Sequence, residues 1–358
     1  MGNAATLTAT HFAGIDVSKD TLDGCLLGPD DRTRPKRFAN ATAGFAALVA
    51  WADRLASGGV VHFCLEATGP YSAALAEYLH AAGRLVSVAN PARVKAHMKS
   101  CGQANKTDPA DAKAIATFAR DRKPRLWVPP SPAVRQVQAL VRRRDELRRM
   151  AAADKTRLDA PGLTPAARKS LTRTVTFLSK EADRVQAEAE AIVAAAPALA
   201  ADLALLESVK GVGRPTATTV LAELPPVDLL PSAESAAAYA GLAPSEFTSG
   251  KSVKKYTRLS KAGNVRLRTA LYLPTLTAIR FNPVLKAFYA RLTDPHRPGG
   301  PKPKMQAVGA CMRKLVMICY GVLKNRTPFD PQHTGVRPAA GGSPVDPPAA
   351  GRTTRNGG

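Results

Sequence analysis

Apolar and polar positions in the first part of the chain follow the two-residue period of strands. Residues 12–17 and 21–27 are short apolar runs joined by the polar turn Ser18-Lys19-Asp20, a pattern that predicts a β-hairpin. An amphipathic helix is expected over 43–56, and an apolar run of strand length follows at 60–65. The chain therefore begins as a sheet with helices packed on it.

Strands and helices continue to alternate after this third strand. Thr68-Gly69-Pro70 marks the start of another helix, a strand is expected over 85–88, a helix over 91–99, and a further helix begins at Pro109. A hairpin followed by alternating helices and strands predicts an α/β fold with a sheet of mixed strand direction. We assign this unit to residues 1–125.

The pattern changes to long helices behind a proline-rich break at 124–132. Residues 134–158 are Arg-rich and helical, and Thr164-Pro165 begins a second helix after a turn at Pro161-Gly162. Its apolar positions recur at spacings of four and three, as in the seam of a coiled coil: Leu171, Val175, Leu178, Ala182, Val185, Ala189 and Ile192. Residues 126–200 are therefore predicted to be a helical coiled-coil hairpin, whose seam packs either within the chain or between two subunits.

Residues 201–330 are predicted to form a third, mainly helical unit. Gly211-Val-Gly213 lies between two helical stretches in 203–224, as in a helix-hairpin-helix, although a plain helix–helix turn has the same pattern. Short helices are expected after it, with basic loops at 251–261 and 298–304. Pro, Gly, Ala and Arg dominate from Gln332 onward, and the segment 331–358 is expected to be a disordered tail.

The charge of the chain narrows the class of partner. The 358 residues include 51 Lys and Arg against 28 Asp and Glu, a formal net charge of +23. Such an excess favours a polyanion. No run of about eighteen apolar residues and no signal peptide is visible, so nucleic acid is preferred over a membrane. Five scattered cysteines without a Cys-x-x-Cys pair indicate reduced core thiols in a cytoplasmic protein.

Four acidic residues fall at the ends of predicted elements. Asp16 lies near the end of the first strand, Glu66 directly follows the third, and Asp108 and Asp111 share one face of a helix because they are three residues apart. Carboxylates that meet repel one another unless a cation neutralises them, and Mg²⁺ prefers such hard oxygen ligands. Each residue alone also fits an ordinary turn or helix-cap role, and spacing does not show that they converge.

Several basic groups are candidates for contact with nucleic acid. The Gly-Val-Gly turn can present backbone amides to phosphate with neighbouring charge, and other basic clusters can bind phosphate or form solvated faces. Aromatic residues are only 5% of the chain, which argues against base stacking as the main mode of recognition. The candidates are Arg142, Arg143, Arg144, Lys210, Gly211, Gly213, Arg214, Lys251, Lys254, Lys255, Arg266 and Arg268.

Motifs in both halves of the chain resemble one family of mobile-element enzymes. They are Gly14-Ile-Asp16-Val-Ser-Lys19, Glu66-Ala-Thr-Gly69-Pro-Tyr71, Asn90-Pro91 and Lys106-Thr-Asp108-Pro-Ala-Asp111, then Tyr239-Ala-Gly241-Leu-Ala-Pro244, Thr248-Ser249-Gly250-Lys251 and Leu259-Ser-Lys-Ala-Gly263-Asn264. The chain thus resembles, from about residue 11 to about residue 330, the DEDD insertion-sequence transposases of the IS110 family, including its IS1111 branch.

The resemblance implies a mechanism as well as a fold. It implies a RuvC-like, RNase H-type domain that holds Mg²⁺ through Asp16, Glu66, Asp108 and Asp111, and a catalytic Ser249 that forms a phosphoserine link to DNA. The family usually has Ser-Ser-Gly-Gly where this chain has Thr-Ser-Gly-Lys, so Ser252 and Ser245 are alternative nucleophiles.

The resemblance also implies partners. They are the DNA of the element ends and target, a bridge-type guide RNA, and further copies of the chain in a dimer that pairs into a tetramer, with a composite site made by two subunits. The expected activity is excision and insertion of a mobile element. A RuvC-like junction nuclease and a non-catalytic nucleic-acid-binding protein remain the alternatives.

Overall fold

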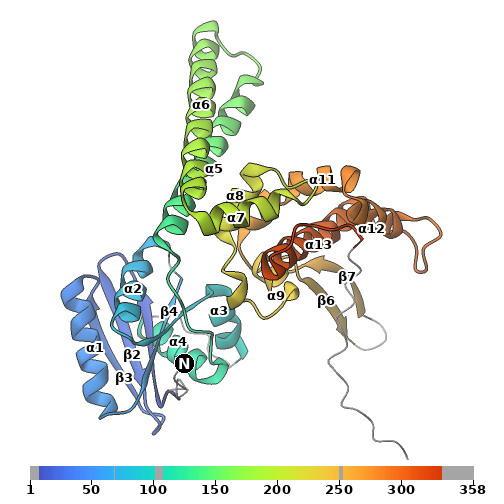
Figure 1. Cartoon of the computed structure of the whole chain (residues 1–358). Coiled ribbons are helices and arrows are strands. Elements are labelled where there is room, and N and C mark those ends of the chain that lie inside the picture. Colours follow the sequence, from blue (N-terminus) through green and yellow to red (C-terminus); the bar gives the residue numbers. More distant parts are fainter. Residues whose placement is uncertain (1–7, 68, 101–107, 250–252, 333–358) are drawn as a thin grey trace, which may run out of the picture.

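A computed structural model describes residues 8–67, 69–100, 108–249 and 253–332. Three parts follow one another along the chain in Figure 1: an N-terminal sheet with helices, a long helical hairpin, and a C-terminal helical part that carries a small strand pair. The division into units at residues 125, 200 and 330 stays a prediction. The proposed tail lies almost wholly outside the described residues.

A five-stranded mixed sheet forms the first part. Its strands are β1 (His11–Val17), β2 (Thr21–Leu27), β3 (Thr33–Ala39), β4 (Val61–Glu66) and β5 (Leu85–Ala89), in the order β3-β2-β1-β4-β5. β2 is antiparallel to β1 and β3, whereas β1, β4 and β5 are mutually parallel. The predicted hairpin and the mixed strand direction are confirmed.

The edge strand β3 was not indicated by the hydrophobic pattern. Its sequence, TRPKRFA, holds three basic residues and a proline, and only Phe38 is buried. A proline and charged side chains are tolerated there because an edge strand has one side without a neighbouring strand.

Helices cover both faces of the sheet. Helices α1 (Thr42–Ala56) and α2 (Ala73–Ala81) pack on one face, where Ile15, Leu22 and Phe63 are buried, and the short helix η1 (Gly69–Ser72) precedes α2. Helices α3 (Pro91–Ser100) and α4 (Asp108–Arg122) cover the opposite face, where Cys64 packs with Ile115 and Phe118. The two faces therefore have separate apolar clusters.

The helical hairpin consists of α5 (Pro132–Leu158) and α6 (Pro165–Ala195). The side chains of Ser131 and Thr164 cap the two helices, and a proline follows each cap. The two helices pack along one another through Leu147, Ala151, Leu178, Ala182 and Val185. Leu178, Ala182 and Val185 of the predicted seam therefore pack within the chain, while a coiled coil along the whole seam stays a prediction.

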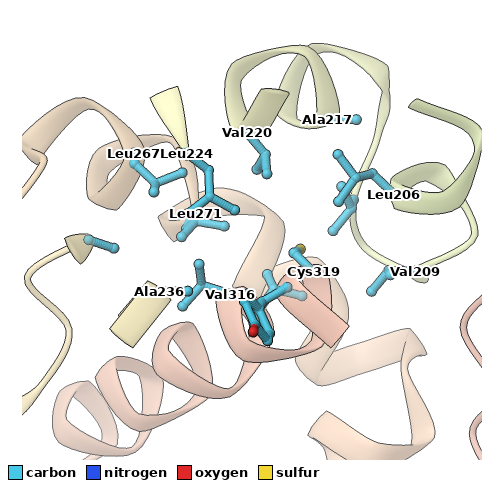
Figure 2. Close-up of a cluster of buried hydrophobic side chains, with 14 of the residues drawn as sticks. Leu206, Val209, Ala217, Val220, Leu224, Ala236, Leu267, Leu271, Val316 and Cys319 are labelled. Carbon is cyan, nitrogen blue, oxygen red and sulfur yellow. The ribbon is translucent and has the colours of Figure 1, made fainter. Parts of the chain in front are cut away.

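The C-terminal part surrounds the long helix α13 (Lys304–Asn325), whose Leu315, Val316 and Cys319 are fully buried (Figure 2). By length and composition α13 also qualifies as a membrane span, but here it is the core helix. The other elements are α7 (Pro197–Glu207), α8 (Arg214–Glu223), η2 (Val227–Leu229), α9 (Ala233–Tyr239), β6 (Pro244–Ser249), β7 (Val253–Leu259), α10 (Val265–Ala270), α11 (Tyr272–Phe281) and α12 (Pro283–Thr293).

Strands β6 and β7 pair as an antiparallel ribbon. The expectation of a basic loop over 251–261 is therefore wrong for most of that range. Lysines interrupt the apolar alternation of VKKYTRL, and a ribbon of two strands is held by backbone hydrogen bonds without a long apolar face. The second predicted basic loop does lie between α12 and α13.

Candidate catalytic site

The register of two parallel strands brings Asp16 and Glu66 side by side. Gly14 pairs with Cys64 and Ile15 with Leu65, so Asp16 and Glu66 occupy the next position of the ladder, at the carboxyl ends of β1 and β4. Neighbouring strands lie about 4.8 Å apart. Both acids are half-buried, and their side chains leave the sheet on the face that α3 and α4 cover.

Helix α4 adds the other two acids at the same edge. Its backbone rests on Gly14: a Cβ built there would lie 2.2 Å from both the Ala112 carbonyl oxygen and the Ala116 nitrogen. At its far end, Arg120 forms an ion pair with Asp31, in the turn after β2, next to the start of β1. Helix α4 therefore runs antiparallel to β1 and points its first turn toward Asp16.

The backbone thus assembles the predicted acids at one edge, whereas their side chains are only partly described. Asp111 is half-buried on the first turn of α4, and the side chain of Asp108 lies outside the described residues. Among the side chains that are described, no three His, Cys, Asp or Glu residues gather closely enough to hold a metal ion. Convergence of the carboxylate oxygens remains a prediction.

The donor chemistry of this edge suits a hard cation. Cys64, on the same sheet face two residues before Glu66, is fully buried, and burial raises the pKa of its thiol to about 12. Burial also raises the pKa of Cys25, which faces the same helix from β2. Both sulfurs therefore stay protonated at neutral pH, and the ligands offered are carboxylate oxygens, as Mg²⁺ requires.

A fifth carboxylate at this edge was missed in the sequence analysis. Asp23 lies directly opposite Asp16 in the β1–β2 ladder. Its Oδ1 accepts a 2.8 Å hydrogen bond from Arg37 Nε, and this ion pair balances the charge of Asp23 beside Asp16. The predicted turn Ser18-Lys19-Asp20 would set residue 16 against residue 22, whereas the observed ladder pairs Val17 with Leu22 and therefore Asp16 with Asp23.

Asn40 ties together the two loops that flank the acids. Its Nδ2 donates to the carbonyl oxygens of Ser18 at 2.8 Å, Lys19 at 3.3 Å and Tyr71 at 3.3 Å. The turn after Asp16 is thereby fixed to the segment that follows Glu66. No sequence motif singled out this asparagine.

Ser249 is the last residue of β6, at the tip of the ribbon. The root of the ribbon is closed by the Ser260 nitrogen, which donates to Ala243 O at 2.9 Å, so the tip lies roughly 20 Å away along the strand. Figure 1 shows the ribbon well separated from the N-terminal sheet of the same chain. The structure therefore does not bring Ser249 to the acids; its side chain, and all of Gly250, Lys251 and Ser252, lie outside the described part, while Ser245 is exposed near the root.

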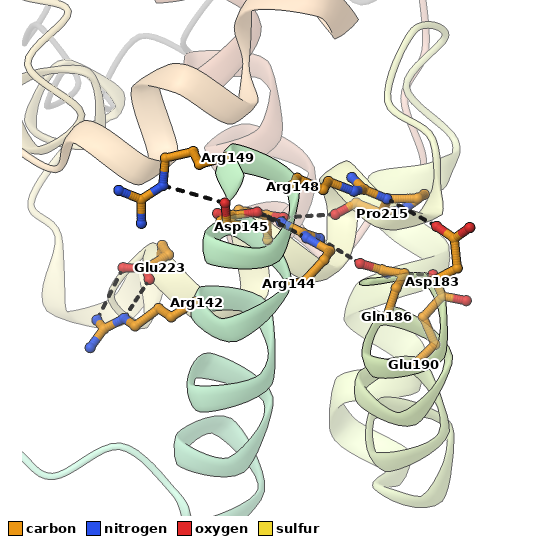
Figure 3. A network of polar contacts seen from close by, with 11 residues as sticks. Arg142, Arg144, Asp145, Arg148, Arg149, Asp183, Gln186, Glu190, Pro215 and Glu223 are labelled. Atoms are coloured by element: carbon orange, nitrogen blue, oxygen red, sulfur yellow. Dashed lines mark hydrogen bonds and ion pairs between the residues drawn. The ribbon is translucent and has the colours of Figure 1, made fainter. Parts of the chain in front are cut away.

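The arginine cluster on α5 mostly makes contacts within the chain (Figure 3). Arg144 is only 3% exposed and donates to Gln186 at 2.5 Å and to Thr219 at 3.1 Å, so its prediction as a nucleic-acid contact is wrong for this arrangement. Arg142 donates to the buried Glu223 at 2.8 Å. Arg143 is exposed beside Glu146, and the Arg142 side chain is 40% exposed, so these two arginines stay accessible whereas Arg144 does not.

The other basic candidates differ in their surroundings. Arg214 pairs with Glu207 at 3.0 Å, and Arg268 donates to Ala240 O at 3.0 Å, so both have internal partners. Lys210 is exposed and Arg266 is half-buried. Lys254 and Lys255 lie in β7 with side chains outside the described residues.

The Gly211–Gly213 segment forms the turn between α7 and α8, as a helix-hairpin-helix requires. Gly211 has φ +106°, and a Cβ there would lie 2.6 Å from the Ala278 side chain, so a glycine is needed for both the turn and the close contact with α11. Whether this turn binds phosphate remains a prediction.

Comparison with known proteins gives two family matches. Residues 13–161 match the DEDD transposase domain of IS110 elements, and residues 203–290 match the transposase IS116/IS110/IS902 family. Pilin gene-inverting proteins of Moraxella bovis and Moraxella lacunata are each 29% identical over 321 residues, which is 89% of this chain and 97% of theirs. An uncharacterized 43.6 kDa protein of insertion element IS110 in Streptomyces coelicolor is 27% identical over 161 residues, 45% of this chain and 37% of its own length.

Proposed function

We propose that the chain is a transposase of the IS110 family, whose models match residues 13–161 and 203–290, and that it cuts and rejoins DNA with an acidic site on the N-terminal sheet and a serine on the C-terminal ribbon. The observation that carries the proposal is the β1–β4 register. It places Asp16 beside Glu66 at the edge toward which α4 points its first turn, with Asp108 and Asp111.

The acids have a binding role in this proposal. Asp16, Glu66, Asp108 and Asp111 hold Mg²⁺, which when bound stabilises negative charge on a scissile phosphate. The ion pair between Arg37 and Asp23 keeps a fifth negative charge from acting on Asp16 and on the DNA backbone.

Ser249 is the proposed nucleophile. Its Oγ forms a bond to phosphorus as the bond from phosphorus to one deoxyribose oxygen breaks, and that sugar hydroxyl takes up the proton that the serine loses. The reverse reaction with a different sugar hydroxyl rejoins the strand to a new partner. Because the ribbon lies apart from the acids of its own chain (Figure 1), a second subunit supplies one half of the site.

Selection of the DNA sites is assigned to a bridge-type guide RNA. The net charge of +23 suits a complex with both RNA and DNA, and the low aromatic content disfavours base stacking by the protein itself. RNA that co-purifies with the chain and pairs with its DNA sites would support this part of the proposal. A protein that recombines DNA after complete ribonuclease treatment would contradict it.

The test separates recombination from simple hydrolysis. Ser249→Ala should abolish the covalent protein–DNA adduct and strand exchange, whereas Ser245→Ala and Ser252→Ala should keep both. Asp16→Asn should abolish cleavage while DNA binding persists. Strand cleavage that continues in Ser249→Ala without an adduct would instead identify a metal-dependent nuclease of the junction-resolving kind.

Inversion is a second candidate outcome of the same chemistry. It is favoured by the similarity to the pilin gene-inverting proteins, which extends over most of both chains. Two plasmids distinguish the outcomes: inversion of the segment between two sites in opposite orientation supports this candidate, and circles released from between two sites in the same orientation support excision as in transposition.

A further inference from the structure

Glu223, the last residue of α8, is a buried carboxylate that connects distant parts of the chain. Its side chain is 1% exposed. It accepts hydrogen bonds from Arg142 on α5, from Nε at 2.8 Å and from Nη2 at 3.3 Å (Figure 3), and from Asn264 Nδ2 at 2.8 Å. The carboxylate therefore lies between the helical hairpin and the segment that follows β7.

Asn264 in turn fixes the root of the ribbon. The Oδ1 atom of Asn264 accepts a hydrogen bond from the Leu267 nitrogen and so caps α10. The backbone nitrogen of Asn264 donates to Tyr239 O at 2.6 Å. Next to it, a Cβ on Gly263 would lie 2.4 Å from both Gly241 N and Tyr239 O. The chain before β6 and the chain after β7 are thus pressed together where Asn264 meets Glu223.

Tyr239 lies in the same electrostatic environment. Burial raises the pKa of its hydroxyl. A hydrogen bond with Asn264 lowers this pKa, and the nearby charge of Glu223 raises it. The hydroxyl therefore stays protonated at neutral pH and able to donate. We call the contact of the Glu223 carboxylate on α8 with the Arg142 guanidinium on α5 and the Asn264 amide before α10 the joint; Tyr239 on α9 is 38% exposed and lies at its border.

We infer that Glu223 is a positioning residue that couples the α5–α6 hairpin to the ribbon carrying Ser249. A buried carboxylate is costly unless it is paired, and fully paired polar groups fix one geometry more sharply than apolar packing does. The orientation of the β6–β7 ribbon must be fixed at its root, because the two strands are held there while Ser249 lies at the tip. This inference rests on the proposed role of Ser249.

Arg142 makes the α5–α6 hairpin part of the contact at Glu223. On the proposed mechanism Ser249 must reach a phosphate held by acids outside its own ribbon, and a misplacement of about 1 Å can cost about 100-fold in rate. Arg142 links α5 to Glu223, and Asn264 links Glu223 to the root of the ribbon. A movement of the hairpin therefore changes the direction of the ribbon and the position of Ser249.

The sharpest test is Asn264→Ser in the full-length chain. Serine is also a good N-cap, so the cap of α10 is kept while the shorter side chain no longer reaches Glu223. We expect the rate of serine–DNA adduct formation at saturating DNA to fall about tenfold or more, with DNA affinity unchanged. Asn282→Ser is the matched control, because Asn282 caps α12 away from the ribbon, and it should leave the rate unchanged.

Arg142→Ala and Glu223→Gln complete the experiment. Arg142→Ala should raise hydrogen exchange of the Ser260, Lys261 and Asn264 amides, although Arg142 lies on another helix; Asn282→Ser should not. Glu223→Gln keeps an acceptor for Asn264 and should retain more adduct formation than Glu223→Ala. A normal adduct rate in Asn264→Ser, or an equal loss in Asn282→Ser, overturns the inference alone. No adduct from the unaltered chain refutes the proposed function itself.

Discussion

Arg144 is a charged side chain used as a core residue. Its guanidinium lies between α5, α6 and α8, where it contacts Gln186 and Thr219 and forms an ion pair with Asp145 at 2.5 Å. The Thr219 hydroxyl extends this hydrogen-bond network by donating to Pro215 O at 2.8 Å (Figure 3). Because the charge is removed from water, these partners must all be present for the arrangement to be stable.

Removal of this side chain should therefore be costly. Arg144→Ala removes the donor to the Gln186 and Thr219 side-chain oxygens and leaves a cavity between the helices, and we expect the free energy of unfolding to fall by about 3–5 kcal/mol. Arg148→Ala, four residues along the same helix, is the control: its pair with Asp183 is 3.7 Å long and exposed, so a loss of about 0–1 kcal/mol is expected. Urea unfolding followed by circular dichroism measures both, and equal losses would contradict the buried network.

The burial of Arg144 could in part have been foreseen from the sequence. The buried residues of α5 include Val137, Val141, Arg144, Leu147 and Ala151, which follow one another at helical spacings of three and four. The stripe of apolar residues thus passes directly through position 144. Its partners could not be foreseen, because Gln186 and Thr219 come from helices whose packing against α5 is set by the whole fold.

At the scale of elements, the contact of α4 with β1 decides the geometry of the acidic edge. Gly14 lies two residues before Asp16, and Ala112 lies one residue after Asp111. The helix backbone reaches the strand because Gly14 has no side chain. The distance between Asp16 and the first turn of α4 therefore depends on one glycine.

Gly14→Ala should disturb this geometry. The added methyl group would lie 2.2 Å from the helix backbone, so α4 must shift by more than an ångström and move Asp108 and Asp111 away from Asp16. We expect Mg²⁺-dependent strand cleavage to fall by about 100-fold or more. Gly24→Ala, on the opposite face of β2, is the control, since its added Cβ has no neighbour nearer than 3.4 Å. Cleavage assays on folded protein should separate the two variants; similar activity in both would show that α4 does not set the site.

The sequence predicted best those elements that have a strong apolar period. The β1–β2 hairpin, the alternation that follows it, and the α5–α6 hairpin all have one. Strands β3 and β7 do not, because three basic residues interrupt the apolar pattern of each strand and their pairing comes from the backbone. The acids could be placed at element ends from the sequence alone, but their common edge follows from the β1–β4 register, which connects residues about fifty positions apart.

At the scale of the whole molecule, the two proposed catalytic elements are carried by different parts of the chain. The acids lie at the edge of the N-terminal sheet, and Ser249 lies at the end of a ribbon separated from that sheet (Figure 1). Closure within one chain would require a large movement of the hairpin and the C-terminal part. Exchange of the two elements between symmetric copies requires none, and a two-fold dimer forms two such sites at once.

Mixing two inactive variants tests this arrangement. In a dimer of Asp16→Asn with Ser249→Ala, one composite site combines both defects, and the other combines intact acids with an intact serine. With random pairing of equal amounts, about half of the dimers are mixed and each has one intact site. The mixture should therefore show about a quarter of the strand-exchange activity of the wild-type protein. If each site were built within one chain, every site would contain a defect and the mixture would stay inactive.

Subunits must exchange before the assay, so the variants are mixed unfolded and refolded together; wild-type protein treated in the same way gives the reference. A mixture no more active than either variant alone would place the acids and the serine of each working site in the same chain.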